Sequence, residues 1–157
     1  MPTGTAYYVG YEAGRLLGEY DINGAPIYEM IWLGEIPVGV MQRTGTAAGN
    51  NLAVTRFEIY ADHLGAPRVI TRPSDKAIVW RWDTAEAYGG AAANQNPNGL
   101  GAFVYNQRFP GQTFDAETGL FQNWNREYNP RIGRYMQSDP IGLAGGSIPM
   151  SMSEEIH

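Results

Sequence analysis

Few residues in this sequence have the types that chemistry at a protein site requires. There is no cysteine, which excludes disulfides and thiolate chemistry, and the only histidines are His63 and His157. A metal site needs three or four converging ligands, and no spacing in the sequence supplies them. We therefore expect no metal and no cofactor.

Asp62, His63 and Ser74 together have the residue types of a hydrolase trio. The sequence around Ser74 is not a nucleophile elbow, the sharp turn that presents a catalytic serine. We assign no hydrolase site to these residues.

The carboxylates near the C-terminus lie in turn sequences. These turns are Asp115-Ala-Glu-Thr-Gly119, Tyr128-Asn-Pro-Arg-Ile-Gly133 and Asp139-Pro-Ile-Gly142. Asp or Asn opens each turn because its short side chain binds the backbone just ahead, and Gly closes each because it accepts a positive φ. We interpret Asp115 and Glu117 as turn formers, and the favoured role of Asp139 is to cap its turn by binding backbone donors.

Arginine dominates the basic residues, at 10 of 11, and Lys76 is the one lysine. Arginine stacks on aromatic rings and forms forked bonds to carboxylates, so several arginines are expected within aromatic-lined sheet faces. Arg108, Arg126 and Arg134 could brace the Asp139 turn in this way. Ordinary positions on strand faces are equally expected for them.

Three short aromatic rows could form a platform on which sugar rings stack: Trp80/Trp82, Phe103/Tyr105 and Phe121/Trp124. Trp80, Trp82 and Trp124 are the candidate binding residues of this alternative. Packing within sheets is the favoured interpretation, because aromatic and β-branched residues hold strand pairs together.

The elements that must position these residues are predicted to be short strands joined by turns. Gly and Pro number 20 and 10, 12% of residues are aromatic and only 17% are charged, which is typical of many strands rather than helices. Residues 7–33 read as paired strands, with a tight-hairpin signal at Asn23-Gly24. Residues 28–41 read as two strands joined near Gly34-Glu35, where Pro37 marks an edge or bulged strand.

Further along, a loop at residues 44–51 precedes a strand from Leu52 to Ala61, with Phe57, Ile59 and Ala61 on one face. In the run 76–83, Ile78, Trp80 and Trp82 share a face. Residues 84–100 carry no strand pattern, so we expect them to be mobile or in contact with another molecule. Strand-like alternation resumes at residues 101–109, with Phe103 and Tyr105 on one face.

The net charge limits the kinds of partner that the protein can bind, and the N-terminal sequence limits its route of export. A net charge of −5 without a basic cluster argues against nucleic acid and against an anionic membrane surface. The start, Met1-Pro-Thr-Gly4, is unlike a signal peptide, and no run approaches the roughly 18 apolar residues of a membrane helix. Export is therefore expected through a dedicated machine or as part of a larger protein.

A degenerate repeat runs along the chain: an aromatic residue, an acid, a spacer, Gly and an apolar-rich run. Its copies include Tyr11-Glu-Ala-Gly14, Tyr20-Asp-Ile-Asn-Gly24, Asp62-His-Leu-Gly65, Phe114-Asp-Ala-Glu-Thr-Gly119 and Tyr128-Asn-Pro-Arg-Ile-Gly133. The ordered motifs RFPGQ, FDAETGL, GRYMQSDPIGL and AGG follow between residues 108 and 146. Together these features resemble the Rhs/YD-repeat family, and residues 108–146 resemble the C-terminal part of the core that forms the shell of bacterial polymorphic toxins. The residues that carry this motif are Arg108, Pro110, Gly111, Asp115, Gly119, Gly133, Arg134, Asp139, Pro140 and Gly142.

The resemblance implies a cleavage role for Asp139. In the family, the Asp of this Asp-Pro turn acts with a second Asp about twenty residues on, because paired carboxylates can activate water for attack on an amide and so release the toxin. The second Asp is missing here, so we expect no enzyme activity and no self-cleavage.

We predict an all-β fold, an antiparallel β-hairpin meander of roughly nine to eleven strands that is a fragment of a larger β-shell. Residues 1–146 are expected to form the Rhs core-like region, and residues 147–157 a divergent, disordered or loosely docked tail. The resemblance implies a structural module of a toxin-encapsulating shell, which lacks its toxin domain.

The resemblance also implies the setting. It implies a bacterial protein that lies in the cytoplasm before export or is secreted within a larger toxin assembly. It also implies a role in type VI secretion and in competition between bacteria. The expected partners are other Rhs shell segments or a second copy, joined by strand pairing. A toxin domain or a component of the secretion machine is a further partner. The alternatives are a carbohydrate- or cell-surface-binding module and a residual aspartyl autoprotease segment.

Overall fold

The computed structural model describes residues 5–9, 15–44, 53–83 and 87–138. Within these residues every element of regular structure is a β-strand, and all strand pairs are antiparallel. The all-β meander predicted from the sequence is therefore confirmed. No helix of the described residues is long and apolar enough to cross a membrane.

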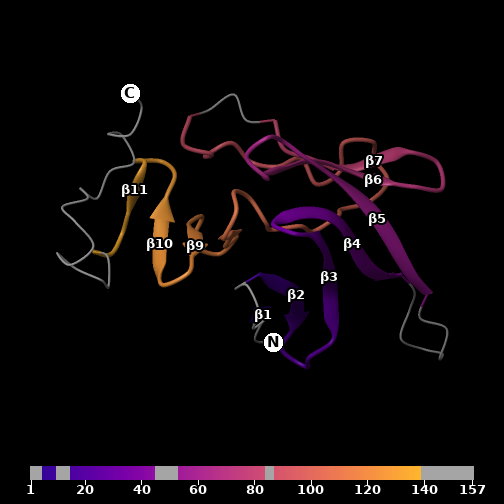
Figure 1. Ribbon diagram of the computed structural model, residues 1–157, viewed down its shortest axis with the longest axis horizontal. Helices are drawn as coiled ribbons and strands as arrows, with labels where there is room; N and C mark the ends of the chain where they lie inside the picture. Colours follow the sequence, from indigo (N-terminus) through magenta and orange to yellow (C-terminus); the bar gives the residue numbers. More distant parts are fainter. Residues whose placement is uncertain (1–4, 10–14, 45–52, 84–86, 139–157) are drawn as a thin grey trace. The chain divides into compact units, whose positions relative to one another are not determined.

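The strands form one sheet of seven and one sheet of four, each ordered as the chain runs (Figure 1). The first sheet contains β1 (Thr5–Val9), β2 (Leu16–Asp21), β3 (Pro26–Leu33), β4 (Ile36–Thr44), β5 (Ala53–Ala61), β6 (Pro67–Arg72) and β7 (Ala77–Arg81). The second contains β8 (Gln112–Phe114), β9 (Phe121–Asn123), β10 (Arg126–Asn129) and β11 (Arg134–Tyr135). Neighbouring strands in each sheet are thus consecutive in the sequence.

The chain divides into two compact units, one around each sheet. The first unit spans Met1–Trp82 and Ala93–Tyr105, and the second spans Asp83–Ala92 and Asn106–His157. The predicted boundary at residue 146 and the tail at residues 147–157 lie outside the described residues.

Two copies of the sequence repeat form the same turn. In each, the aspartate that opens the turn, Asp21 or Asp62, accepts hydrogen bonds through Oδ1 from the amides two and four residues further on, at 2.8–3.0 Å. In each, a glycine with positive φ donates its amide to the carbonyl of that aspartate: Gly24 at φ 78° and Gly65 at φ 76°. The repeat is therefore a structural unit of one turn and one strand, as the sequence predicts.

The predicted alternation along β5 is confirmed, since Phe57 and Ile59 are buried while Glu58 and Tyr60 are exposed. These residues face a core that also contains Tyr28, Met30, Val40, Ile70, Val79, Trp80 and Trp82. Buried apolar residues at alternate positions of β3 and β5 thus build part of one face of the sheet.

Register shifts, which mark bulges or irregularities, modify this pattern in several strand pairs, and two of them concern residues discussed above. Pro37 lies in β4, which is an interior strand, so the prediction of an edge strand is wrong. The register between β3 and β4 shifts beside Pro37, which confirms the alternative of a bulge. A second shift, between Ile70 and Thr71 on β6, lets both Val79 and Trp80 of β7 face the core.

Residues 93–105, which we call the strap, pack against the first sheet without forming a strand of their own. Phe103 lies edge-on to Phe57 with ring centroids 4.7 Å apart, and Tyr105 lies 5.2–5.3 Å from the rings of Tyr28 and Trp80. The expectation that residues 84–100 are mobile or held by another molecule is wrong for the strap, because it contacts its own sheet. A strand over residues 101–109 is also wrong, although Phe103 and Tyr105 are buried and Val104 is exposed as the alternation predicts.

The second sheet is held by a ladder of four aromatic rings, one from each strand. Phe114, Phe121, Tyr128 and Tyr135 stand opposite one another in register. Successive ring centroids are 5.6, 6.2 and 5.5 Å apart. Cross-strand aromatic pairs of this kind stabilise antiparallel strands that are too short to be stable alone.

Candidate functional site

Arg108, Pro110 and Gly111 shape the turn that enters β8. The amide of Arg108 donates to the carbonyl of Gln112 at 3.0 Å, so the chain returns on itself across Pro110 and Gly111. Arg108 is 3% exposed, and its guanidinium lies 5.2 Å from the ring centre of Phe114. The motif arginine therefore serves the packing of this hairpin.

The Asp115–Gly119 turn forms as predicted. The carboxylate of Asp115 accepts from the amide of Glu117 at 2.9 Å and from the hydroxyl of Thr118 at 2.8 Å. Gly119 closes the turn at φ 71°. Asp115 is thus a turn former, which is the role the sequence indicates.

The turn that ends in Gly133 (φ 63°) forms in the same way, with Asn129 accepting from the amide of Arg131 at 3.0 Å. Arg134 follows on β11 and is exposed. Just beyond, the side chain of Gln137 accepts from the amide of Glu127 at 2.7 Å and donates to its carboxylate at 3.0 Å. Asp139, Pro140 and Gly142 lie outside the described residues.

Arginines stack on aromatic rings as the composition predicts. Besides Arg108, Arg126 lies 3.9 Å from the ring centre of Tyr135, and Arg68 lies 5.1 Å from that of Trp82. The sequence does not single out Arg68, because Trp82 is 14 positions further along the chain.

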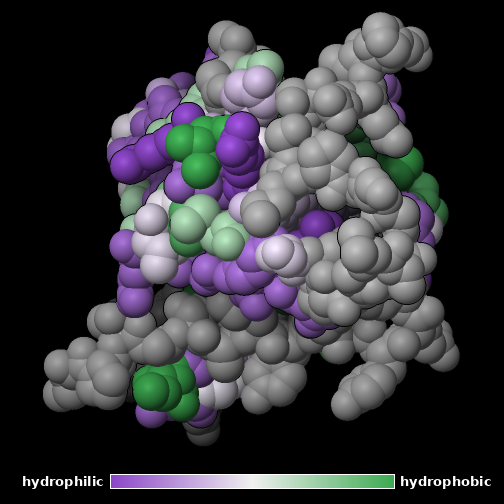
Figure 2. Space-filling model, turned by 90° about the vertical axis from the view of Figure 1, so that its left-hand side faces the viewer, coloured by the Kyte–Doolittle hydropathy of each residue, from purple (hydrophilic) through white to green (hydrophobic). Residues whose placement is uncertain are grey.

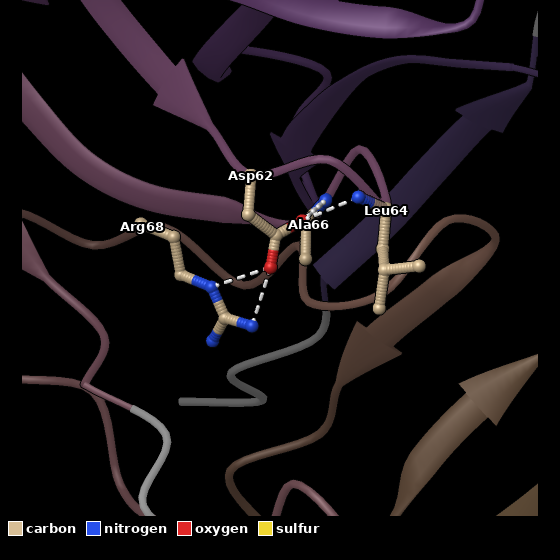
Figure 3. A network of polar contacts seen from close by, with 4 residues as sticks. All are labelled: Asp62, Leu64, Ala66 and Arg68. Carbon is tan, nitrogen blue, oxygen red and sulfur yellow. Dashed lines mark hydrogen bonds and ion pairs between the residues drawn. The ribbon is translucent and has the colours of Figure 1, made fainter.

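Arg68 also braces the Asp62 turn. Its Nε and Nη2 donate to Oδ2 of Asp62 at 2.8 and 2.6 Å, while Oδ1 accepts from the amides of Leu64 and Ala66 (Figure 3). Burial acts to raise the pKa of Asp62, but the bonds from Arg68 and the two amides outweigh it and lower the pKa below 3.8. This carboxylate is fully engaged in holding the turn.

The next turn has a similar brace at the surface. Arg72 donates to both oxygens of Asp75 at 3.0 and 2.6 Å, and the amide of Ala77 donates to the same carboxylate. The bond from Arg72, with that of Ala77, lowers the pKa of Asp75 to about 2. The turn closes through Lys76, which has a positive φ of 57°.

The described residues contain no cluster that could bind a metal ion. No group of three His, Cys, Asp or Glu side chains in them is placed to hold a metal ion. Asp62 accepts from Arg68 and the turn amides, which is a structural role rather than that of the orienting acid of a hydrolase.

Two of the three candidate sugar-binding tryptophans are buried. Trp80 and Trp82 are both 0% exposed, so neither can offer a ring face to a sugar, and that assignment is corrected. Trp124 is 62% exposed in the hairpin turn between β9 and β10, with an unusual φ of 54° for a side chain of its size. On the face shown in Figure 2, the hydrophobic residues form small separate groups among hydrophilic ones.

The remaining candidate site is the pair of outer edges of the seven-stranded sheet. The sheet is open, because β1 and β7 stand at opposite ends of the strand order. The edge of an open sheet presents backbone donors and acceptors that can pair with another strand. At β7 the strap occupies part of this edge, since the amides and carbonyls of Arg81 and Asn94 bond to each other at 2.9 and 2.7 Å.

Comparison with known proteins places these features in context. No family model matches the chain. It is 32% identical over 149 residues to "Double-stranded DNA deaminase toxin A" of Burkholderia cenocepacia, a match that covers 87% of this chain. It is 38% identical over 90 residues, 57% of its length, to "Toxin protein Tse5" of Pseudomonas aeruginosa. It is 35% identical over 82 residues, 52% of its length, to "Probable deoxyribonuclease RhsA" of Dickeya dadantii.

This chain is related to the Rhs proteins. The match extends over only 10%, 6% and 5% of the lengths of these three bacterial relatives. The chain thus corresponds to an Rhs-associated module that matches only a small part of each of these longer proteins.

Proposed function

We propose that this chain is a structural module of an Rhs-type shell that encloses a toxin. The module joins neighbouring shell segments, or a second copy of itself, by pairing strands. It has no catalytic role, and it works within a toxin assembly that one bacterium delivers to another through a type VI secretion machine.

The observation that carries this proposal is the open seven-stranded meander. Strand order follows chain order, and β1 and β7 are not neighbours. A sheet of this kind can be continued strand by strand, whereas a closed barrel cannot. The toxin names of the longer relatives support the same interpretation.

Size-exclusion chromatography with light scattering tests this function, on the full chain alone and mixed with the shell region of a longer Rhs relative. We expect a self-associated species or a complex with the longer chain. A well-folded monomer with no affinity for the longer chain would contradict the proposal.

Carbohydrate or cell-surface binding is a second candidate, and the exposed ring of Trp124 favours it. A glycan array would show binding that Trp124→Ala abolishes. Met136→Ala is the matched control, because Met136 is also exposed in the second unit, at 52%. An array without hits would remove this candidate.

A further inference from the structure

We infer that Asn23 is a site of spontaneous covalent modification, at which the side-chain amide is converted into aspartate and isoaspartate. The sequence contains two Asn-Gly pairs, Asn23-Gly24 and Asn98-Gly99. The structure leaves the first pair open to this reaction and protects the second. The inference goes beyond the proposed function and does not depend on it.

The reaction needs only the chain itself and water. The backbone nitrogen of Gly24 loses its proton to solvent base and attacks Cγ of Asn23, so an N–Cγ bond forms while the Cγ–Nδ2 bond breaks and ammonia leaves. Water then opens the cyclic imide at either carbonyl carbon, which gives aspartate or isoaspartate without oxidation or reduction. A following glycine favours the attack because it has no side chain in the way and accepts many backbone angles.

The side chain of Asn23 is free to approach that nitrogen. Asn23 is exposed in the turn between β2 and β3, and no described residue forms a hydrogen bond with its side-chain amide. The turn is closed by the amide of Gly24, which donates to the carbonyl of Asp21 at 2.9 Å. This bond joins residues three positions apart, so opening one exposed turn releases the nitrogen of Gly24.

Asn98 lies in a similar turn, but its side chain is held. The amide of Gly99 donates to the carbonyl of Asn96 at 3.4 Å, a weaker bond than that of Gly24. However, Nδ2 of Asn98, the group that must leave, donates to the carbonyl of Ile78 on β7 at 3.0 Å. This contact joins residues 20 positions apart, so it breaks only when the strap moves away from β7.

Another copy of the repeat forms the same turn without a reactive residue. Leu64 follows Asp62 by two positions, as Asn23 follows Asp21, and the closing glycines have φ angles of 76° and 78°. Both turns have the same pair of backbone bonds between the aspartate and the residues three and four positions on. Asn23→Leu should therefore keep the turn and abolish the reaction.

The modification should loosen the turn between β2 and β3. In isoaspartate the main chain passes through the former side chain, so an extra methylene separates Gly24 from the rest of the turn, and its bond to Asp21 is lost. Either product also places a new carboxylate two positions from that of Asp21, and like charges repel. We expect faster hydrogen exchange at the amides of Gly24 and Ala25 in the modified protein.

Ageing the full chain in slightly alkaline buffer tests the inference, with the same chain unfolded in urea as the reference. Trypsin separates the two sites because Arg43 and Arg81 lie between them, and mass spectrometry of the peptides follows each conversion. An isoaspartyl methyltransferase assay detects the isoaspartate. We expect the ratio of folded to unfolded rate to be about two- to tenfold smaller for Asn98 than for Asn23, which is the effect of one hydrogen bond.

Loosening the strap should remove the protection of Asn98. Phe103 is 6% exposed against Phe57, so Phe103→Ala weakens the docking of the strap. Leu100→Ala is the matched control, because Leu100 lies in the strap and is 51% exposed. We expect the rate at Asn98 to rise in the Phe103→Ala protein and not in the Leu100→Ala protein. Circular dichroism checks that the sheet remains folded.

Several outcomes would overturn the inference. Equal ratios at the two sites, or a larger ratio at Asn98, would contradict it. So would a folded chain in which Asn23 stays intact while the unfolded chain reacts, or an isoaspartate signal that Asn23→Leu does not reduce. A rate at Asn98 that Phe103→Ala does not raise would show that the strap is not what protects it. None of these results bears on the shell role, which the chromatography decides.

Discussion

At the scale of single residues, aspartate–arginine pairs hold two hairpin turns of the first sheet, at Asp62 and at Asp75. Asp62 binds its own turn with one oxygen and Arg68 with the other, and Arg68 in turn covers the ring of Trp82. One side chain thus links a surface turn to a buried ring of the core. A forked, partly buried pair of this type contributes more than an exposed pair.

Arg68→Ala should lower the free energy of unfolding by about 2 kcal/mol, because it removes charged hydrogen bonds and a stacking contact together. Urea unfolding followed by tryptophan fluorescence measures this, since Trp80 and Trp82 are buried in the same unit. Arg56→Ala is the matched control, because Arg56 is exposed on β5 and its loss should change stability by less than about 0.5 kcal/mol. Equal effects of the two substitutions would contradict the assigned brace.

The free energy of unfolding should also depend on pH through the carboxylate of Asp75. The folded protein lowers the pKa of this carboxylate from 3.8 to about 2, so the ionised form stabilises the fold. That contribution is complete above about pH 4 and is lost as the pH falls through about 2. Asp75→Asn should therefore flatten the curve of unfolding free energy against pH in this window. Parallel curves for the two proteins would show that the pair with Arg72 contributes nothing.

At the scale of elements, glycine with positive φ shapes the turns of the second sheet, but the space around each glycine differs. A Cβ atom on Gly111 would lie 2.8 Å from Nε1 of Trp124, whereas one on Gly119 would lie 4.0 Å from its nearest neighbour, Arg131. Both have similar φ angles, 78° and 71°. Of these two glycines, only Gly111 therefore brings its turn into close contact with a second hairpin.

Gly119→Ala should cost about 1–2 kcal/mol from backbone strain alone. Gly111→Ala should cost about 1–3 kcal/mol more, because the methyl group also forces Trp124 aside. Hydrogen exchange of the β8 and β9 amides would follow the effect within the second unit. The close contact would be contradicted if both substitutions raised exchange equally.

At the scale of the whole molecule, the expected lack of self-cleavage can be tested directly. The incubated 157-residue chain should keep a single mass of 17.3 kDa, since none of its residues from 140 to 157 is a second aspartate that could pair with Asp139. Mass spectrometry at intervals measures this. A second species that disappears in the Asp139→Ala protein would instead establish the residual autoprotease.

The sequence by itself determined the hairpins of this protein. The turns at Asp21, Asp62 and Asp115 depend on bonds between residues at most five positions apart, so their residue types specify them locally. The alternation along β5 likewise follows from the pleat of a strand.

Only the tertiary structure decided which aromatic rings form the core and how the β7 edge ends. The sequence places Trp80 and Trp82 on the same face of a strand, but it does not decide whether that face is exposed to solvent or buried. The strap carries no strand pattern at all. Its place depends on Phe103 meeting Phe57 and on Tyr105 meeting Tyr28, residues that are far apart along the chain. Contacts of that range exist only once the sheet has formed, because the loss of chain entropy must first be offset by the packing of the sheet itself.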